Sequence, residues 1–289
     1  MSEEKKHIDE ATGVETTGHE WDGIRELNNP MPRWWLWTFY ATIVWGVGYM
    51  ILYPAWPLIN SATPGLLGYS SRGELSRDLD RVAQERAELT QAVRAASLPE
   101  ILSDERLRTF AVAGGQAAYR VNCSQCHGSG AQGAPGYPNL NDDAWVWGGD
   151  IESLYQTIAH GVRDKIDPDT RVSEMPPFAD MLSPIEVART AAYVRSLSGL
   201  ESDPDKAAAG ETLYADNCAV CHGPGGEGGK DFGAPNLADA LWLYGSSEGE
   251  IARQIQAPRH GVMPAWSHRL GDDTVKKLAV FVHSLGGGE

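Results

Sequence analysis

The chain is poor in cysteine and in basic residues. Only 4 of its 289 residues are cysteine, and 24 Lys and Arg stand against 39 Asp and Glu, which gives a formal net charge of −15. Such a chain has little positive charge with which to neutralise phosphates, so we exclude nucleic-acid binding. No βαβ pattern flanks the cysteines, which argues against a thioredoxin-like redox pair. The sequence also shows no cluster of a nucleophile with a general base, so we expect no bond chemistry catalysed by the chain itself.

All four cysteines lie in two copies of one phrase, NCSQCHG at 122–128 and NCAVCHG at 217–223. A zinc site needs four N or S ligands, and each copy supplies at most three. Cys-x-x-Cys-His is the attachment signature of c-type haem, in which both sulfurs form thioethers with the vinyl groups and the histidine ligates the iron. We therefore predict two covalently bound haem c groups. Their predicted ligands are Cys123, Cys126 and His127 in the first copy and Cys218, Cys221 and His222 in the second.

The sixth iron ligand is expected to be a methionine, because a thioether fills the position and raises the reduction potential. Met175 in EMPPF and Met263 in VMPAW share a Met-Pro context, in which proline stiffens the loop that presents the sulfur. Met181 is expected to be a core residue instead. His160 and His260, in the twin phrases AHGVRD and RHGVMP, are alternative ligands, although hydrogen bonding near a propionate is the simpler interpretation.

The two halves resemble each other beyond these motifs. GQAAYRVNCSQCHG (115–128) aligns with GETLYADNCAVCHG (210–223), and LSPIEVARTAAYVRSLSG (182–199) aligns with LGDDTVKKLAVFVHSLGG (270–287). About twelve extra residues, around RDKIDPDTRVSE, lengthen the ligand loop of the first copy. Each copy is predicted as a helix, the haem motif, a Gly/Pro-rich loop, a Met loop and a terminal helix. The end helices are expected to pack through their aromatic side chains: Tyr119, Tyr214, Tyr193 and Phe281.

This layout resembles the cytochrome c fold, used twice in tandem. A domain of roughly 90 residues is small for a single core, and the buried macrocycle supplies the missing apolar mass. We therefore expect a haemless form of either domain to be poorly folded.

Residues 34–53 are 20 consecutive residues without charge or proline, which is the length needed to cross a bilayer. Tryptophans cluster at the start of this stretch and at Trp56, as in interfacial aromatic belts. A cleaved signal peptide is a poor alternative, because the preceding segment is acidic and the apolar stretch is too long. Haem c is attached outside the cytoplasmic membrane in bacteria. We therefore expect a single-pass inner-membrane protein with residues 1–33 in the cytoplasm and the haem motifs in the periplasm.

The predicted fold is mainly α-helical, with one N-terminal transmembrane helix followed by two tandem cytochrome c-type domains. The expected segments are a cytoplasmic N-terminal segment (1–33), a transmembrane helix (34–59), a periplasmic linker (60–107), a first cytochrome c domain (108–200) and a second (201–289). The linker contains an amphipathic helix over 71–97, which is expected to lie against the haem domains or a partner subunit. Its apolar stripe consists of Leu75, Leu79, Val82, Leu89 and Val93.

The stretch EWDGIRELNNPMPRWWLWTFY (20–40) runs directly into the membrane helix, ahead of the two haem motifs. Over essentially the whole chain, this order resembles the dihaem subunit of cbb3-type cytochrome c oxidases (CcoP or FixP). The DGIxELNNPxPRWW element is far more specific than CxxCH alone. The resemblance implies that the chain accepts electrons from a soluble or membrane-anchored cytochrome c, with the cytochrome bc1 complex as a further candidate donor. It then passes them to a monohaem subunit, which feeds the haem–copper catalytic subunit that reduces oxygen and pumps protons.

Carried over to this sequence, the resemblance assigns the two Cys-x-x-Cys-His motifs to haem attachment and assigns Met175 and Met263 as axial ligands. The simplest pairing keeps each methionine with the haem of its own copy, but an exchange is open if the domains interlock. Iron with both His and Met bound has no open position, which favours electron transfer. A free membrane-tethered shuttle is an alternative, although the ELNNP element argues against it. A dihaem peroxidase is disfavoured by the twin Met-Pro loops.

Overall fold

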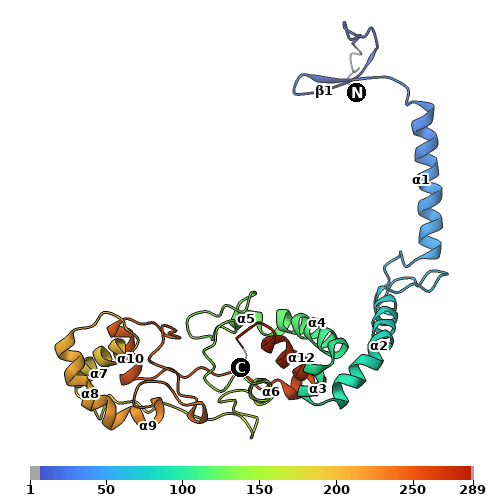
Figure 1. Ribbon diagram of the computed structural model, residues 1–289. Coiled ribbons are helices and arrows are strands. Elements are labelled where there is room, and N and C mark those ends of the chain that lie inside the picture. Colours follow the sequence, from blue (N-terminus) through green and yellow to red (C-terminus); the bar gives the residue numbers. More distant parts are fainter. Residues whose placement is uncertain (1–6, 288–289) are drawn as a thin grey trace. The chain divides into compact units, whose positions relative to one another are not determined.

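The structure is a computed structural model that describes residues 7–287 (Figure 1). The ends of the predicted segments 1–33 and 201–289 lie outside the described residues. The chain divides into two compact units, Met1–Gln84 and Glu85–Glu289. Helices dominate the described part of the chain, so the predicted mainly α fold class is confirmed.

A short β-hairpin precedes the apolar helix in the first unit. Strands β1 (Thr16–Trp21) and β2 (Ile24–Leu27) pair in antiparallel register. Asp22 and Gly23 both have positive φ angles at the turn, the backbone that a two-residue type I′ hairpin turn requires. This hairpin was not among the predicted elements, although Asp-Gly is a turn signal.

Helix α1 (Arg33–Leu52) is the predicted membrane helix. It is long and apolar enough to cross a bilayer, and none of its residues is buried against other parts of the described chain. The helix ends at Leu52, and Tyr53 is extended because the following Pro54 disfavours helical backbone at the residue before it. The predicted boundary at residue 59 is therefore wrong, since residues 53–59 do not continue the helix.

The predicted linker helix is present as α2 (Ser71–Ala95), and a short helix α3 (Leu98–Ser103) follows it. Val93, near the end of α2, is fully buried, whereas Leu75 and Leu79 are 59% and 61% exposed. Among the described residues of the apolar stripe, Val93 at its C-terminal end is therefore the one that is fully buried.

The second unit contains the two repeats, and each yields a similar succession of helices. The first repeat forms α4 (Glu105–Asn122), α5 (Ser124–His127), α6 (Ile151–His160) and α7 (Pro184–Leu197). The second forms α8 (Pro204–Asn217), α9 (Ala219–His222), the 3-10 helix η1 (Lys230–Phe232), α10 (Glu248–Gln256), α11 (Ser267–Leu270) and α12 (Asp272–His283). Helices α6 and α10 were not predicted, although Asp150 and Ser247 cap their N-termini.

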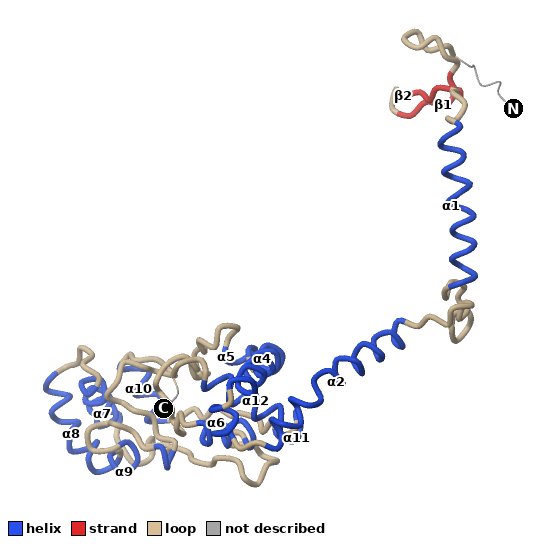
Figure 2. Tube along the Cα trace, turned by 45° about the vertical axis from the view of Figure 1, so that its right-hand side comes forward, coloured by secondary structure: helices blue, strands red, loops and turns tan. Residues whose placement is uncertain are grey.

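The terminal helices are exchanged between the repeats. Helix α12 packs on α4, and α7 packs on α8, so the red end of the chain lies among green elements in Figure 1; Figure 2 shows the same pairing. The aromatic pairs predicted between end helices are present: Tyr119 with Phe281 and Tyr214 with Tyr193. The segments 108–200 and 201–289 are therefore not the packing units, because each core takes its terminal helix from the other segment.

Glycine allows these exchanged helices to cross closely. A Cβ on Gly115 in α4 would collide with the Lys277 carbonyl oxygen and would lie 2.6 Å from Cβ of Phe281. Gly210 in α8 has the equivalent relationship to the Arg189 carbonyl oxygen and to Tyr193 of α7. The glycines that open the two aligned repeat phrases are thus the points at which the main chains meet.

The apolar positions that recur at helical spacing in the two terminal helices are buried: Val187, Ala191, Val194, Val275, Leu278, Ala279 and Val282. Met181 is 58% exposed, so its prediction as a core residue is wrong. It lies in the turn before the Ser183 N-cap of α7, where Phe178 and Leu182 supply the buried side chains instead.

Candidate haem-binding sites

Each Cys-x-x-Cys-His motif forms a tight turn at the end of a helix. In the first, α4 ends at Asn122, Cys123 caps it through a bond from its N–H to the Tyr119 carbonyl, and α5 ends at His127. Gly128 follows with φ of +83°, a backbone favoured by glycine. The second motif repeats this arrangement with α8 and α9, and Gly223 at φ of +79°. Both motifs therefore present their two cysteines and one histidine on one compact turn.

A tyrosine from the preceding helix fixes each turn. The Tyr119 hydroxyl donates a hydrogen bond to the Gly128 carbonyl over 2.8 Å, and the Tyr214 hydroxyl donates to the Gly223 carbonyl over 2.7 Å. Burial, and then the nearby Cys123, raise the pKa of Tyr119 to about 12, so the hydroxyl keeps its proton at neutral pH. Residues expected only as aromatic core thus also hold the ends of the haem motifs.

The motif histidines are oriented by main-chain carbonyls. Nδ1 of His127 lies 2.9 Å from the Pro138 oxygen, and Nδ1 of His222 lies 3.0 Å from the Pro235 oxygen. Because a carbonyl only accepts, Nδ1 carries the proton, and the Nε2 lone pair is left for iron. Burial lowers the pKa of both imidazoles, against the opposing effect of these carbonyl bonds, and this favours the neutral form that ligates metal.

No disulfide joins the four cysteines, all of which lie within the described residues. Burial, and then the charge of the second thiol in each motif, raise the pKa of Cys123 and of Cys218 to about 11. These thiols are protonated at neutral pH, unlike the thiolates of catalytic redox pairs.

Each of the two candidate methionines is half-buried and packs against the core around the haem-motif helix of the opposite repeat. Met263 packs against the hydrophobic cluster that contains Tyr119, and Cys123 packs against the same cluster. Met175 packs against the cluster that contains Tyr214 and Cys218. This is the exchanged pairing, not the simplest one, and it follows from the exchange of α7 and α12, which end the chain segments carrying these methionines.

Two buried indole N–H groups lack an acceptor, and this bears on whether haem fits these sites. Nε1 of Trp145 and Nε1 of Trp242 have no hydrogen-bond partner within the described chain, although buried donors are normally satisfied. Trp145 packs against the first core and Trp242 against the second. A macrocycle carrying propionates would supply the missing acceptors in both cores, so the residues present fit haem c. Sequence reasoning missed this pair, although the phrases DAWVWG and DALWLYG place them at matching points of the repeat.

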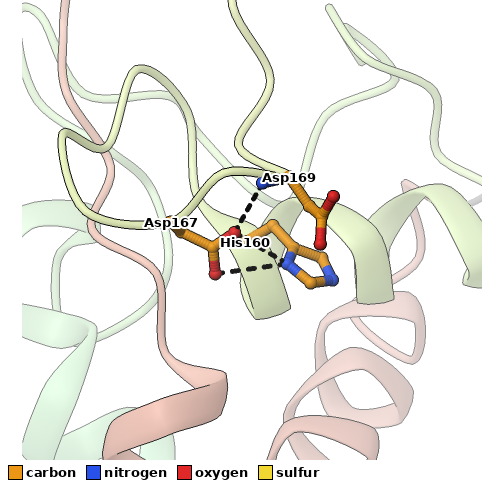
Figure 3. Close-up of side chains that lie close together, drawn as sticks. All are labelled: His160, Asp167 and Asp169. Carbon is orange, nitrogen blue, oxygen red and sulfur yellow. Dashed lines mark hydrogen bonds and ion pairs between the residues drawn. The ribbon is translucent and has the colours of Figure 1, made fainter.

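The alternative histidine ligands have other environments. Nδ1 of His160 lies 3.1 Å and 3.2 Å from the two carboxylate oxygens of Asp167, and the Asp169 N–H also donates to Asp167 (Figure 3). His260 is exposed. His160 is therefore a partner of the loop that follows α6, and the structure gives neither histidine a buried position like that of His222.

Family models match most of the chain. Residues 13–60 match the N-terminal domain of cytochrome oxidase-cbb3, FixP, and residues 110–194 and 205–282 match cytochrome c oxidase, cbb3-type, subunit III. The chain belongs to the FixP/CcoP family of cbb3-type oxidase subunits. The family model matches twice, which confirms the tandem cytochrome c domains of the predicted fold.

Family members align over the full length of the chain. It is 60% identical over 288 residues to the cbb3-type cytochrome c oxidase subunit FixPc of Rhizobium leguminosarum bv. viciae and 58% identical over 289 residues to FixP of Rhizobium meliloti, with 100% of each chain covered. It is 52% identical to CcoP of Cereibacter sphaeroides, with 95% of each chain covered. The predicted resemblance is thus confirmed: this is a membrane-anchored haem c subunit of a cbb3-type oxidase.

Proposed function

We propose that this chain is the electron-entry subunit of the oxidase and that it carries electrons through two haem c groups. One observation carries the proposal: the same arrangement of motif, oriented histidine and half-buried methionine occurs twice in the second unit. Haem c supplies a one-electron iron couple when it is bound. The thiols of Cys123 and Cys126 hold one group and those of Cys218 and Cys221 hold the other.

The axial ligands complete the proposal. His127 and Met263 ligate the first iron, and His222 and Met175 ligate the second, so each methionine crosses to the haem motif of the other repeat. The position of each methionine in the opposite core supports this pairing. With a histidine and a methionine holding each iron, the chain would offer no site for oxygen, and oxygen reduction would belong to another subunit of the complex.

The direction of electron flow follows from the role of an entry subunit. The chain accepts electrons from a soluble or membrane-anchored cytochrome c, or from the cytochrome bc1 complex, and passes them to the monohaem subunit and then to the haem–copper subunit. Its net charge of −15 supports docking of a basic donor, because opposite charge accelerates encounter.

The membrane orientation is part of the same proposal. Helix α1 anchors the chain in the inner membrane, with residues 1–33 in the cytoplasm and both haem segments in the periplasm. This orientation is supported by the place of haem attachment, because haem c is attached outside the cytoplasmic membrane in bacteria.

The test is a reduced-minus-oxidised visible spectrum of the chain, purified in mild detergent from its native membranes, together with haem c quantified per chain. Two haem c per chain with co-purifying b-type haem would support an oxidase subunit. A Cys123→Ala/Cys126→Ala variant should keep one haem c. A c-type spectrum alone, with no partners lost during purification, would contradict the subunit assignment and favour a membrane-tethered electron shuttle.

A further inference from the structure

The loop that carries Met263 (residues 261–266) is hydrogen-bonded to residues of the first repeat. Met263 exchanges two main-chain hydrogen bonds with Val162, of 2.9 Å and 3.0 Å. The Trp266 N–H donates to the carbonyl oxygens of Ile158 and Ala159, both at 3.1 Å. Pro264 has no N–H to satisfy. The remaining donor of this segment is the N–H of Ala265.

The Ala265 N–H donates to Oδ2 of Asp164 over 3.1 Å. The other carboxylate oxygen, Oδ1, accepts from the N–H groups of Ile166 and Asp167 at 2.8 Å and 3.0 Å. The bonds from Ile166, Asp167 and Ala265, in that order, lower the pKa of Asp164, so the carboxylate is charged at neutral pH. The Asp164 carboxylate thus links two loops: Oδ2 binds the Met263 loop, and Oδ1 binds the loop that contains Asp164.

The neighbouring arginine makes a second tie. Arg163 has a left-handed backbone with φ of +54°, and its side chain donates to the carbonyl oxygens of Gly261 at 2.7 Å and Ser173 at 2.7 Å. Its own N–H donates to the Arg171 carbonyl at 2.8 Å. Asp167 is bound in turn to His160, the last residue of α6 (Figure 3). The loop 163–174 is therefore hydrogen-bonded internally, through Arg163, and to the end of α6, through Asp167 and His160.

These ties come from residues that the second repeat lacks. In the first repeat, HGV is followed by RDKIDPDTRVSE (163–174) before Met-Pro, whereas in the second repeat HGV leads directly into Met-Pro. The Met175 loop does have the counterpart of the Trp266 bond, from the Phe178 N–H to the Ile255 carbonyl at 3.1 Å. Arg163 and Asp164 belong to the inserted residues and have no counterpart in the second repeat, so the Met175 loop has no equivalent carboxylate from an inserted loop.

We propose that the insertion 163–174 is a clamp for the exchanged Met263 loop and that Asp164 is its positioning residue. The carboxylate holds Ala265, two residues beyond the thioether, so that Met263 stays in the core of the first repeat. The two haem centres consequently differ in how firmly methionine is held. This inference rests on the proposed ligation of the first iron by Met263.

The test uses the full-length, haem-loaded chain and titrates its ferric form with imidazole, which competes with a methionine ligand. Loss of a charge-assisted bond to the loop should let imidazole bind one haem of Asp164→Ala at an about ten-fold lower concentration than in the wild type. The weak red absorption band of ferric Met-ligated haem should decrease for that haem alone. Asp164→Asn, which keeps one carbonyl acceptor, should fall between the two.

Asp169→Ala is the matched control, because it removes the same charge from the same loop without a bond to residues 261–266, and it should behave as the wild type. The clamp is overturned if Asp164→Ala matches the wild type, or if Asp169→Ala shows the same loss. Failure of the underlying ligation has a different signature: Met263→Ala would then leave the red band and the imidazole titration unchanged.

Discussion

The rings of Tyr119 and Phe281 lie with their centroids 5.4 Å apart, although one residue opens the first repeat and the other closes the second. Tyr193 and Tyr214 make the reciprocal pair at 5.2 Å. Because each core contains helices from both repeats, neither haem segment is structurally independent. Changes in one repeat should therefore be felt at the haem of the other.

Enlarging Gly115 should disturb the crossing of α4 with α12. A methyl group there meets the Lys277 main chain, which cannot move aside as a flexible side chain can. We expect Gly115→Ala to lower the free energy of unfolding by about 1–3 kcal/mol, as overpacking in a core does. Gly114→Ala is the control, because its Cβ would meet only the flexible Lys277 side chain at 3.0 Å. The melting temperatures of the two haem-loaded variants measure this difference. Equal stability of Gly115→Ala and Gly114→Ala would contradict the close crossing.

Replacing Met263 by histidine should keep the haem attached, because the thioether bonds to Cys123 and Cys126 are unchanged. The reduction potential of that haem should fall on the order of 0.1 V, within the roughly 0.8 V range that axial ligands span. A potentiometric titration followed at the c-type band measures this. Met181→His, at an exposed methionine, serves as the control and should leave both potentials unaltered. An unchanged potential in Met263→His would show that this sulfur is not a ligand.

Removing the indole N–H of Trp242 should affect the second haem. Trp242→Phe keeps an aromatic ring in the core but deletes the donor that lacks an acceptor within the described chain. If that N–H binds a propionate, its loss leaves more negative charge uncompensated near the iron and lowers the potential. We expect a fall smaller than the roughly 59 mV that equals a ten-fold change for one electron. Trp145→Phe should likewise lower the reduction potential of the first haem. If neither variant changes a haem potential, these indole N–H groups do not bind propionates.

Acid should weaken the start of α7 through its capping box. Glu186 accepts hydrogen bonds from Oγ and N–H of Ser183, and these bonds lower the pKa of its carboxyl. Since the folded-state pKa is depressed, this stabilisation is present above the unfolded-state value near 4.5 and is lost as the pH falls through the folded-state value. Glu186→Gln should therefore flatten the decline of melting temperature on acidification, measured on the haem-loaded chain. Glu211→Gln, at an exposed site in α8, should decline as the wild type does.

Local chemistry made much of this protein predictable. The haem attachment residues follow from the spacing of Cys123, Cys126 and His127 and its repetition at residues 218–222, because covalent attachment requires these groups within one helical turn. The membrane helix follows from apolar composition and length alone. Its end at Leu52 also has a local cause, the proline at position 54, although the predicted boundary overran it.

The sequence by itself therefore determined the tandem repeat and the membrane anchor, and it predicts the residues of haem attachment. Only the tertiary structure decided which terminal helix packs on which haem-motif helix, and with it the packing of Met263 against the core that contains Tyr119 and of Met175 against the core that contains Tyr214. The physical reason is that α7 and α12 carry equivalent apolar faces, so either could satisfy the pattern of either core. The choice depends on contacts between residues far apart in the chain, such as Gly115 with Lys277 and Asp164 with Ala265, which no local pattern records.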